Sequence, residues 1–174
     1  MKNSPNDSSL LVFIGKPGAG KSTLIDLALY KYNRIDVMPF VKKYEENEKV
    51  PEEKTVVAYH DMYNFLKTEL QSNKRNIVLE LGTNHADLNI NELKSLNENF
   101  RLVIFLCDAP IDVCRDRVKK RTHIIDDVAL ELRLQRNFPE SHLDLLKNTS
   151  IKYVSLNMER PLNENVDELF KYID

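Results

Sequence analysis

Short apolar segments alternate with amphipathic ones along the chain. Four of them have the length of β-strands, at 10–14 (LLVFI), 77–81 (IVLEL), 102–107 (LVIFLC) and 151–156 (IKYVSL). The first three are almost continuously apolar, which is typical of strands that are covered on both faces. A shorter segment at 35–38 (IDVM) predicts a further strand between the first two. The pattern therefore predicts five strands.

Segments with helical periodicity separate these strands. The predicted helices span residues 21–32, 55–71, 111–121, 128–137 and 165–173. Strands that alternate with helices form βαβ units, so we expect an α/β fold with a mostly parallel sheet and helices on both faces.

The length of the chain and the absence of a visible repeat indicate a single domain. A chain of 174 residues fits one domain, which we expect at 10–174 behind a disordered polar tail at 1–9. Residues 42–54 are charged and aperiodic, which predicts a solvated loop or a fraying helix.

The charge and the cysteine content of the chain limit the kinds of molecule that it is expected to bind. The formal net charge is −2, from 25 basic and 27 acidic side chains, so attraction to nucleic acid or to an anionic membrane is not global, and any affinity for phosphate must be local. The two cysteines, Cys107 and Cys114, predict neither a disulfide framework nor a zinc site. The apolar segments are too short to cross a bilayer, and we expect a cytoplasmic protein.

The strongest local motif is GKPGAGKS at residues 15–22, which satisfies G-x-x-x-x-G-K-[ST]. It begins where a predicted strand ends, and a predicted helix begins where it ends. Glycines allow several backbone N–H groups to converge on phosphate oxygens, and the helix N-terminus adds partial positive charge. The lysine reaches the β- and γ-phosphates and the serine hydroxyl can bind Mg²⁺. The predicted nucleotide contacts are Gly15, Pro17, Gly18, Ala19, Gly20, Lys21, Ser22 and Thr23.

Three motifs together resemble the small P-loop kinases: GKPGAGKST, IVLELGTN and LVIFLCDAPIDVCRDRVKKR. Within that superfamily the likeness is greatest to the zeta-toxin-like kinases and the 5′-hydroxyl polynucleotide kinases, and the GKPG opening is also similar to adenylate kinases. It covers residues 10–121 and is weak beyond them. The resemblance implies a three-layer P-loop kinase fold with a small lid at about 117–140, and ATP and Mg²⁺ as cofactors. It also implies a small-molecule, nucleoside or nucleotide acceptor.

An acidic residue on a strand beside the phosphate loop orders Mg²⁺ in these kinases, and Glu80 occupies that place where Asp is usual. The resemblance thus gives Ser22 and Glu80 as the metal residues. A Glu at a strand end that faces solvent is the alternative. However, Glu80 interrupts an apolar segment, and a buried carboxylate needs a cation or hydrogen-bond donors.

These kinases also carry the pattern R-x-x-x-R before the lid, matched here by Arg117 and Arg121. Residues four apart share one helix face and can reach the same ligand. The resemblance implies that Arg117 contacts the adenine or phosphate side and that Arg121 stabilises charge on the transferring phosphoryl group. A basic helix end is the plainer alternative, and Arg133 and Arg136 are alternative lid arginines.

The acceptor side gives weaker signals. Related kinases place an Asp near the end of the second strand to orient the acceptor hydroxyl, and Asp36 is the candidate, with a surface turn as the alternative. His60 lies on a predicted helix, as a substrate contact or part of an exposed face. Thr83 and Asn84 follow a strand at the edge where ligands bind in α/β sheets, although both types also form turns.

Two alternatives remain beside a metabolite kinase. An adenylate-like nucleoside-monophosphate kinase would be expected to carry a D-G-[FY]-P-R-like strand end, where this chain has ELGTN at 80–84. A nucleotide-dependent switch of the GTPase type would carry N-K-x-D, which the sequence lacks. We expect no membrane partner and no nucleic acid, except that phosphorylation of a 5′ end stays open. The protein is expected to be a monomer or a homodimer.

Overall fold

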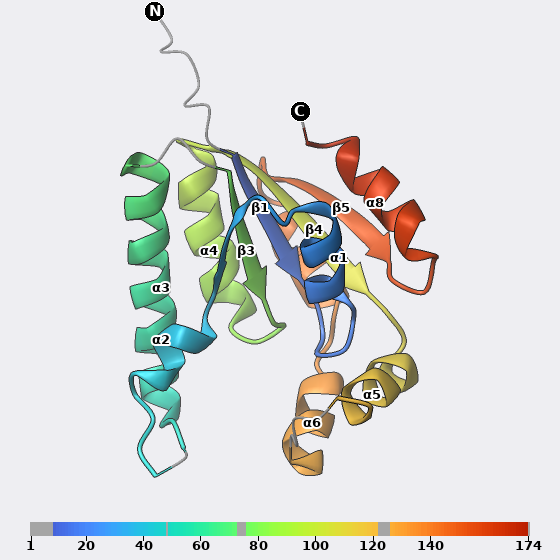
Figure 1. The fold of residues 1–174 in the computed structure, drawn as a ribbon. Helices are drawn as coiled ribbons and strands as arrows, with labels where there is room; N and C mark the ends of the chain where they lie inside the picture. Colours follow the sequence, from blue (N-terminus) through green and yellow to red (C-terminus); the bar gives the residue numbers. More distant parts are fainter. Residues whose placement is uncertain (1–8, 48, 73–75, 122–125, 174) are drawn as a thin grey trace, which may run out of the picture.

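A computed structural model describes residues 9–47, 49–72, 76–121 and 126–173. Its strands form one parallel sheet in the order β2-β3-β1-β4-β5 (Figure 1). The strands are β1 (Ser9–Ile14), β2 (Asn33–Asp36), β3 (Ile77–Leu81), β4 (Arg101–Asp108) and β5 (Lys152–Asn157). The helices are α1 (Lys21–Ala28), α2 (Met38–Lys42), α3 (Glu52–Ser72), α4 (Ala86–Asn97), α5 (Ile111–Lys119), α6 (Asp127–Leu134), α7 (Glu140–Leu146) and α8 (Leu162–Phe170). The predicted five-stranded α/β architecture is confirmed.

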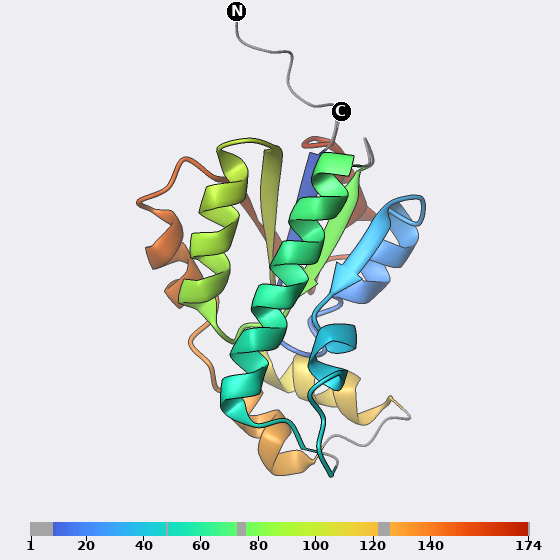
Figure 2. The same ribbon diagram turned by 90° about the vertical axis from the view of Figure 1, so that its left-hand side faces the viewer.

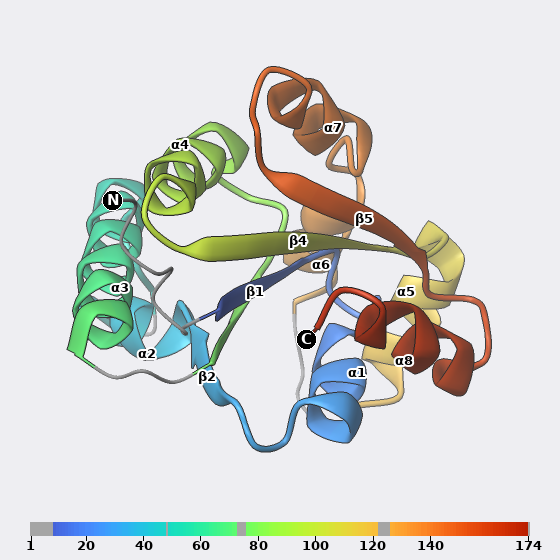
Figure 3. The same cartoon turned by 90° about the horizontal axis from the view of Figure 1, so that it is seen from above.

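Helices cover both faces of this sheet, because its central strand is apolar on both sides. In β1, Leu10 and Val12 face one core cluster, and Leu11 and Phe13 face the other. The first cluster lies under α3, α4 and α7, and the second lies under α1 and α8 (Figure 3). Figure 2 shows α3 and α4 side by side over their face of the sheet. The fold is therefore a three-layer α/β/α sandwich.

The carboxyl ends of the strands meet at one edge of the sheet. The polar motifs of the sequence lie at this edge, at the ends of the strands or in the loops that follow them. Residues 15–20 leave β1 at this edge, and the Gly15 N–H donates to the Leu81 carbonyl of β3 (3.3 Å). Parallel register places Phe13 beside Glu80 and Glu80 beside Asp36. Strand pairing thus brings together residues that lie far apart in the sequence.

Several predicted boundaries were wrong. The second strand spans 33–36 and not 35–38, because the chain turns at Asp36, whose carboxylate accepts from the Met38 N–H (2.8 Å) as α2 begins. The first helix ends at Ala28 and not at residue 32. Within residues 42–54, α2 ends, a bridge joins Glu46 to Lys49, and α3 begins.

The structure also contains α4 and α7, which the sequence analysis did not predict. Ser9, assigned to the tail, is the first residue of β1, and the rest of that tail lies outside the described residues. The same is true of 122–125 within the predicted lid. Of the helices described, none is long and apolar enough to cross a membrane.

Candidate functional site

The loop between β1 and α1 requires glycine at three positions, because of backbone conformation or close packing against its neighbours. Gly18 and Gly20 have positive φ angles of 78° and 102°. A Cβ on Gly15 would lie 2.5 Å from the Cys107 carbonyl oxygen, and one on Gly18 would lie 2.3 Å from that of Cys114. The backbone is thus held in the curled form that lets successive N–H groups face an anion.

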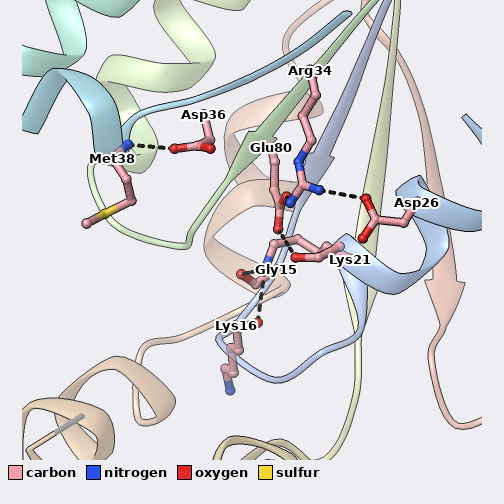
Figure 4. Close-up of polar contacts among 9 residues, drawn as sticks. Gly15, Lys16, Lys21, Asp26, Arg34, Asp36, Met38 and Glu80 are labelled. Carbon is pink, nitrogen blue, oxygen red and sulfur yellow. Dashed lines mark hydrogen bonds and ion pairs between the residues drawn. The ribbon is translucent and has the colours of Figure 1, made fainter. Parts of the chain in front are cut away.

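Lys21 is the first residue of α1, and its side chain folds back over this loop. Its ammonium donates to the carbonyls of Gly15 (2.8 Å) and Lys16 (3.1 Å), and the residue is only 8% exposed (Figure 4). Burial lowers the pKa of Lys21, and the nearby Glu80 carboxylate opposes that shift. The N-cap residue Gly20 has no side chain to cap the helix, so the first amides of α1 stay available to a ligand.

Glu80 lies beside this loop in a network of hydrogen bonds and ion pairs. The Ser22 hydroxyl donates to Glu80 Oε1 (2.9 Å), and Arg34 pairs with Glu80 Oε2 and with Asp26 (2.9 Å; Figure 4). The Glu80 side chain is 14% exposed. The donors that a buried carboxylate requires are therefore present, and one of them, Arg34, was missed from the sequence.

The same pair of side chains is suited to a hard cation. Mg²⁺ in phosphoryl-transfer sites takes one or two protein oxygens, with water and phosphate completing its shell. The Ser22 hydroxyl and the Glu80 carboxylate supply oxygens of that kind at the foot of the loop. Among the described residues there is no cluster of three or more His, Cys, Asp or Glu that could hold a metal without such help.

The two arginines of the R-x-x-x-R pattern differ in their surroundings. Arg117 donates to the carbonyls of Ala19 (3.2 Å), Gly18 (3.5 Å) and Met158 (3.2 Å). It therefore joins the phosphate loop to the segment after β5. Arg121 is exposed and forms no ion pair with a described carboxylate, and it adds to the effect of burial that lowers the Lys21 pKa.

Asp36, the residue predicted to orient an acceptor, lies on β2 next to Glu80 in register. Its Oδ1 accepts from the Met38 N–H, which is the turn role that the sequence analysis left as the alternative (Figure 4). The structure thus brings Asp36 to the edge of the sheet that carries Lys21 and Glu80, with one carboxylate oxygen already engaged.

A buried polar network adjoins the loop after β3. The Tyr59 hydroxyl donates to Asn84 Oδ1 (2.8 Å), and Asn89, which accepts from the Tyr63 hydroxyl (2.9 Å), donates to the Asn84 carbonyl (3.0 Å). The Thr83 hydroxyl is buried and has no hydrogen-bond partner in the described part of the chain. Tyr59 was missed, because nothing in the sequence of a helix shows which tyrosine faces a loop.

His60, by contrast, takes part in contacts between two helices. Its Nδ1 lies 3.6 Å from Glu92 Oε1, and Oε2 of the same carboxylate pairs with Lys67 (2.8 Å). These contacts join α3 to α4. Arg133, in the last turn of α6, and Arg136, just after that helix, are both exposed.

Comparisons with known proteins agree with this geometry. Residues 10–139 match the family described as AAA domain. A search of curated proteins gave no match.

Solved structures share the fold over almost the whole chain. A sugar kinase from Janibacter sp. HTCC2649 is 13% identical, with 96% of this chain and 95% of that chain covered and a TM-score of 0.63. A shikimate kinase from Bacteroides thetaiotaomicron is 17% identical (94% and 96% covered; TM-score 0.60). A deoxyadenosine kinase from M. mycoides is 16% identical (93% and 97% covered; TM-score 0.61). At sequence identities of 13–17%, this likeness shows a shared fold alone.

Proposed function

We propose that this chain, which belongs to the AAA domain family and shares its fold with solved kinases, is a small P-loop kinase that transfers the γ-phosphoryl group of ATP to a hydroxyl of a small molecule, nucleoside or nucleotide. The observation that carries the proposal is the glycine-shaped loop with Lys21 folded over it and the Ser22–Glu80 pair at its foot. This arrangement fits a triphosphate, since the loop and the neighbouring end of β3 together offer amides, an ammonium group and oxygen ligands.

Nucleotide binding is proposed to redirect Lys21. In the structure its ammonium has two carbonyl partners, Gly15 and Lys16, and phosphate oxygens are stronger, charged acceptors. The γ-phosphoryl group would then lie beside Ser22 and Glu80, which would hold Mg²⁺. Bound Mg²⁺ would supply charge neutralisation on the β- and γ-phosphates. Arg117 would keep the loop in shape, and Arg121 would offset charge that develops during transfer.

Asp36 is proposed to orient the acceptor hydroxyl. Transfer forms a bond from the acceptor oxygen to the γ-phosphorus and breaks the bond to the β,γ-bridging oxygen, which leaves with ADP. The hydroxyl proton passes to Asp36 or to water. Among the described residues, Asp36 has a hydrogen-bond partner only at Oδ1, the Met38 amide, so Oδ2 can accept from a substrate hydroxyl. A loose transition state needs this positioning more than a strong base.

The test is acceptor-dependent release of ADP from ATP-Mg²⁺, across sugars, sugar acids, nucleosides and nucleotides. We expect at least one compound to raise ADP release and to gain the phosphoryl group, with both signals lost in Lys21→Ala. Slow ADP release that no acceptor stimulates would instead favour a nucleotide-dependent switch and contradict the proposal.

A further inference from the structure

The segment from α6 to α7 crosses the carboxyl edge of the sheet, and it is anchored on both sides of that crossing. Leu130 and Leu134 are buried in the cluster under α1 and α8, whereas Phe138 is buried in the cluster under α3, α4 and α7. A two-point ion pair between Arg115 and Glu131 also joins α6 to α5 (2.9 Å from Nη2 to Oε2). The backbone between these anchors is therefore held in place.

Two arginines project from this held segment, Arg133 and Arg136. Both are exposed, and neither forms an ion pair with a carboxylate of the described residues. Of the other arginines at this edge, Arg34 and Arg117 are held by described partners, whereas Arg121 is also exposed and has no ion pair with a described carboxylate. Two guanidinium groups thus add uncompensated positive charge at one place.

This charge lies near the polar network after β3. Figure 1 shows α6 below the carboxyl edge, across from the N-terminal half of α3, which carries Tyr59. Tyr59 and Phe138 belong to the same core cluster. Burial raises the pKa of Tyr59 to about 12, while Arg136 and Arg133 lie near enough to the hydroxyl to act in the opposite direction. Tyr59 therefore stays a neutral donor, and the arginines lie on its side of the edge.

An unused polar group lies beside this network. Thr83 is 7% exposed as a residue, its hydroxyl is buried and unpartnered among the described residues, and Asn84 next to it accepts from Tyr59. A buried hydroxyl without a partner is unfavourable unless a ligand or water completes its bonding. The place thus offers two cations and at least one free hydrogen-bonding group to an incoming molecule.

We propose that the acceptor is an anion: it carries a carboxylate or phosphate group that Arg136 and Arg133 bind, in addition to the hydroxyl that is phosphorylated. The inference rests on the proposed function, and names the class of compound that the same site accepts. Arginine suits this task because its planar fork binds two oxygens of one carboxylate or phosphate group. Thr83 and Asn84 would then read the uncharged part of the same molecule.

The test compares neutral acceptors with related compounds that carry a carboxylate or a phosphate group. Glucose, gluconate and glucose 6-phosphate form one series, and adenosine and AMP form another. We expect the anionic members to have kcat/KM values at least about tenfold above the neutral member of their series, since charge-assisted hydrogen bonds to Arg are the strong ones. The carboxylate and phosphate arms tell which anion is preferred.

Variants identify the residues. Arg136→Ala should raise the acceptor KM roughly 10- to 100-fold for anions, with the KM for ATP unchanged. Arg136→Lys should recover part of the loss, and Arg133→Ala should give a smaller one. Lys120→Ala, which removes an exposed cation at the end of α5, is the matched control and should change none of these values.

A binding measurement separates this inference from the proposed function. Calorimetric titration with the same anions, without nucleotide, should show binding that Arg136→Ala abolishes. If neutral and anionic acceptors are used equally and Arg136→Ala has no effect, the inference is wrong and the kinase proposal stands. If anions bind through Arg136 but no compound stimulates ADP release, the kinase proposal is wrong and the anion site stands. Absence of both binding and stimulation overturns both.

Discussion

Replacement of Arg117 by alanine should loosen the phosphate loop and weaken nucleotide binding together. The guanidinium group donates to Ala19, Gly18 and Met158, so it connects the loop to the segment after β5. A Cβ on Gly20 would lie 3.6 Å from Arg117 Nη1, which shows how closely the side chain follows the loop. Its role is therefore to position the loop.

The size of the effect follows from these contacts. A hydrogen bond from a charged donor contributes about 1.5–3 kcal/mol to stability. Two contacts are short enough to count in full, and the one to Gly18, at 3.5 Å, is at the limit. Because the side chain is only half-buried and water can replace part of each bond, we expect a loss of about 2 kcal/mol. For a domain of this size that corresponds to a Tm lower by roughly 4–8 °C.

The assay pairs thermal unfolding with calorimetric titration of ATP-Mg²⁺. We expect Arg117→Ala to lower Tm in the absence of nucleotide and to weaken ATP binding about tenfold, and Arg117→Lys to do much the same, because a lysine cannot span the three carbonyls. Lys119→Ala, exposed on the same helix, is the control. An unchanged Tm with lost ATP affinity would refute this reasoning and favour direct contact with the nucleotide.

Three further predictions concern charge at the site and in the core. Lys21→Met should reduce phosphoryl transfer by at least about 10²–10³-fold in an ADP-release assay while circular dichroism shows a native fold, because it keeps the buried stem and removes only the ammonium; retained turnover would contradict the assignment. Glu80→Gln should raise the Mg²⁺ concentration needed for half-maximal turnover roughly tenfold, because the amide keeps the size of the side chain beside Ser22 but removes its charge. An unchanged Mg²⁺ titration would count against a metal role. Burial lowers the pKa of His142 from 6.5 to about 4, so the unfolded chain binds this proton more tightly than the folded protein does. The free energy of unfolding should therefore be highest above pH 6.5 and should fall by about 3 kcal/mol as the pH drops to 4. Urea unfolding of His142→Leu should lack this part of the pH dependence, and parallel curves for both proteins would show that another group causes it.

Some of the site could be predicted because its residues are contiguous. The motif at 15–22 carries its own geometry, and its place between a strand and a helix was readable from the apolar pattern. Glu80 was proposed from the resemblance to the P-loop kinases, and its place within an apolar segment favoured a buried carboxylate over a solvent-facing one. The confirmed fold class rests on the same apolar pattern.

What could not be predicted depends on register and on tertiary contact. Arg34 meets Glu80 only because β2 pairs with β3 in one register, which no local pattern fixes. In α4, the buried residues Ile90, Leu93 and Leu96 follow a helical spacing, but asparagines at 89, 91 and 97 hide it. His142 lies on a helix of seven residues, too short for periodicity to mark its buried face.

The most direct measurement of the central claim is calorimetric titration of the purified protein with ATP-Mg²⁺, beside the Lys21→Met variant. If the loop after β1 holds a triphosphate, the wild-type protein should bind one nucleotide per chain and the variant should bind it at least about tenfold more weakly. Equal binding by both proteins, or no binding by folded wild-type protein, would contradict the account.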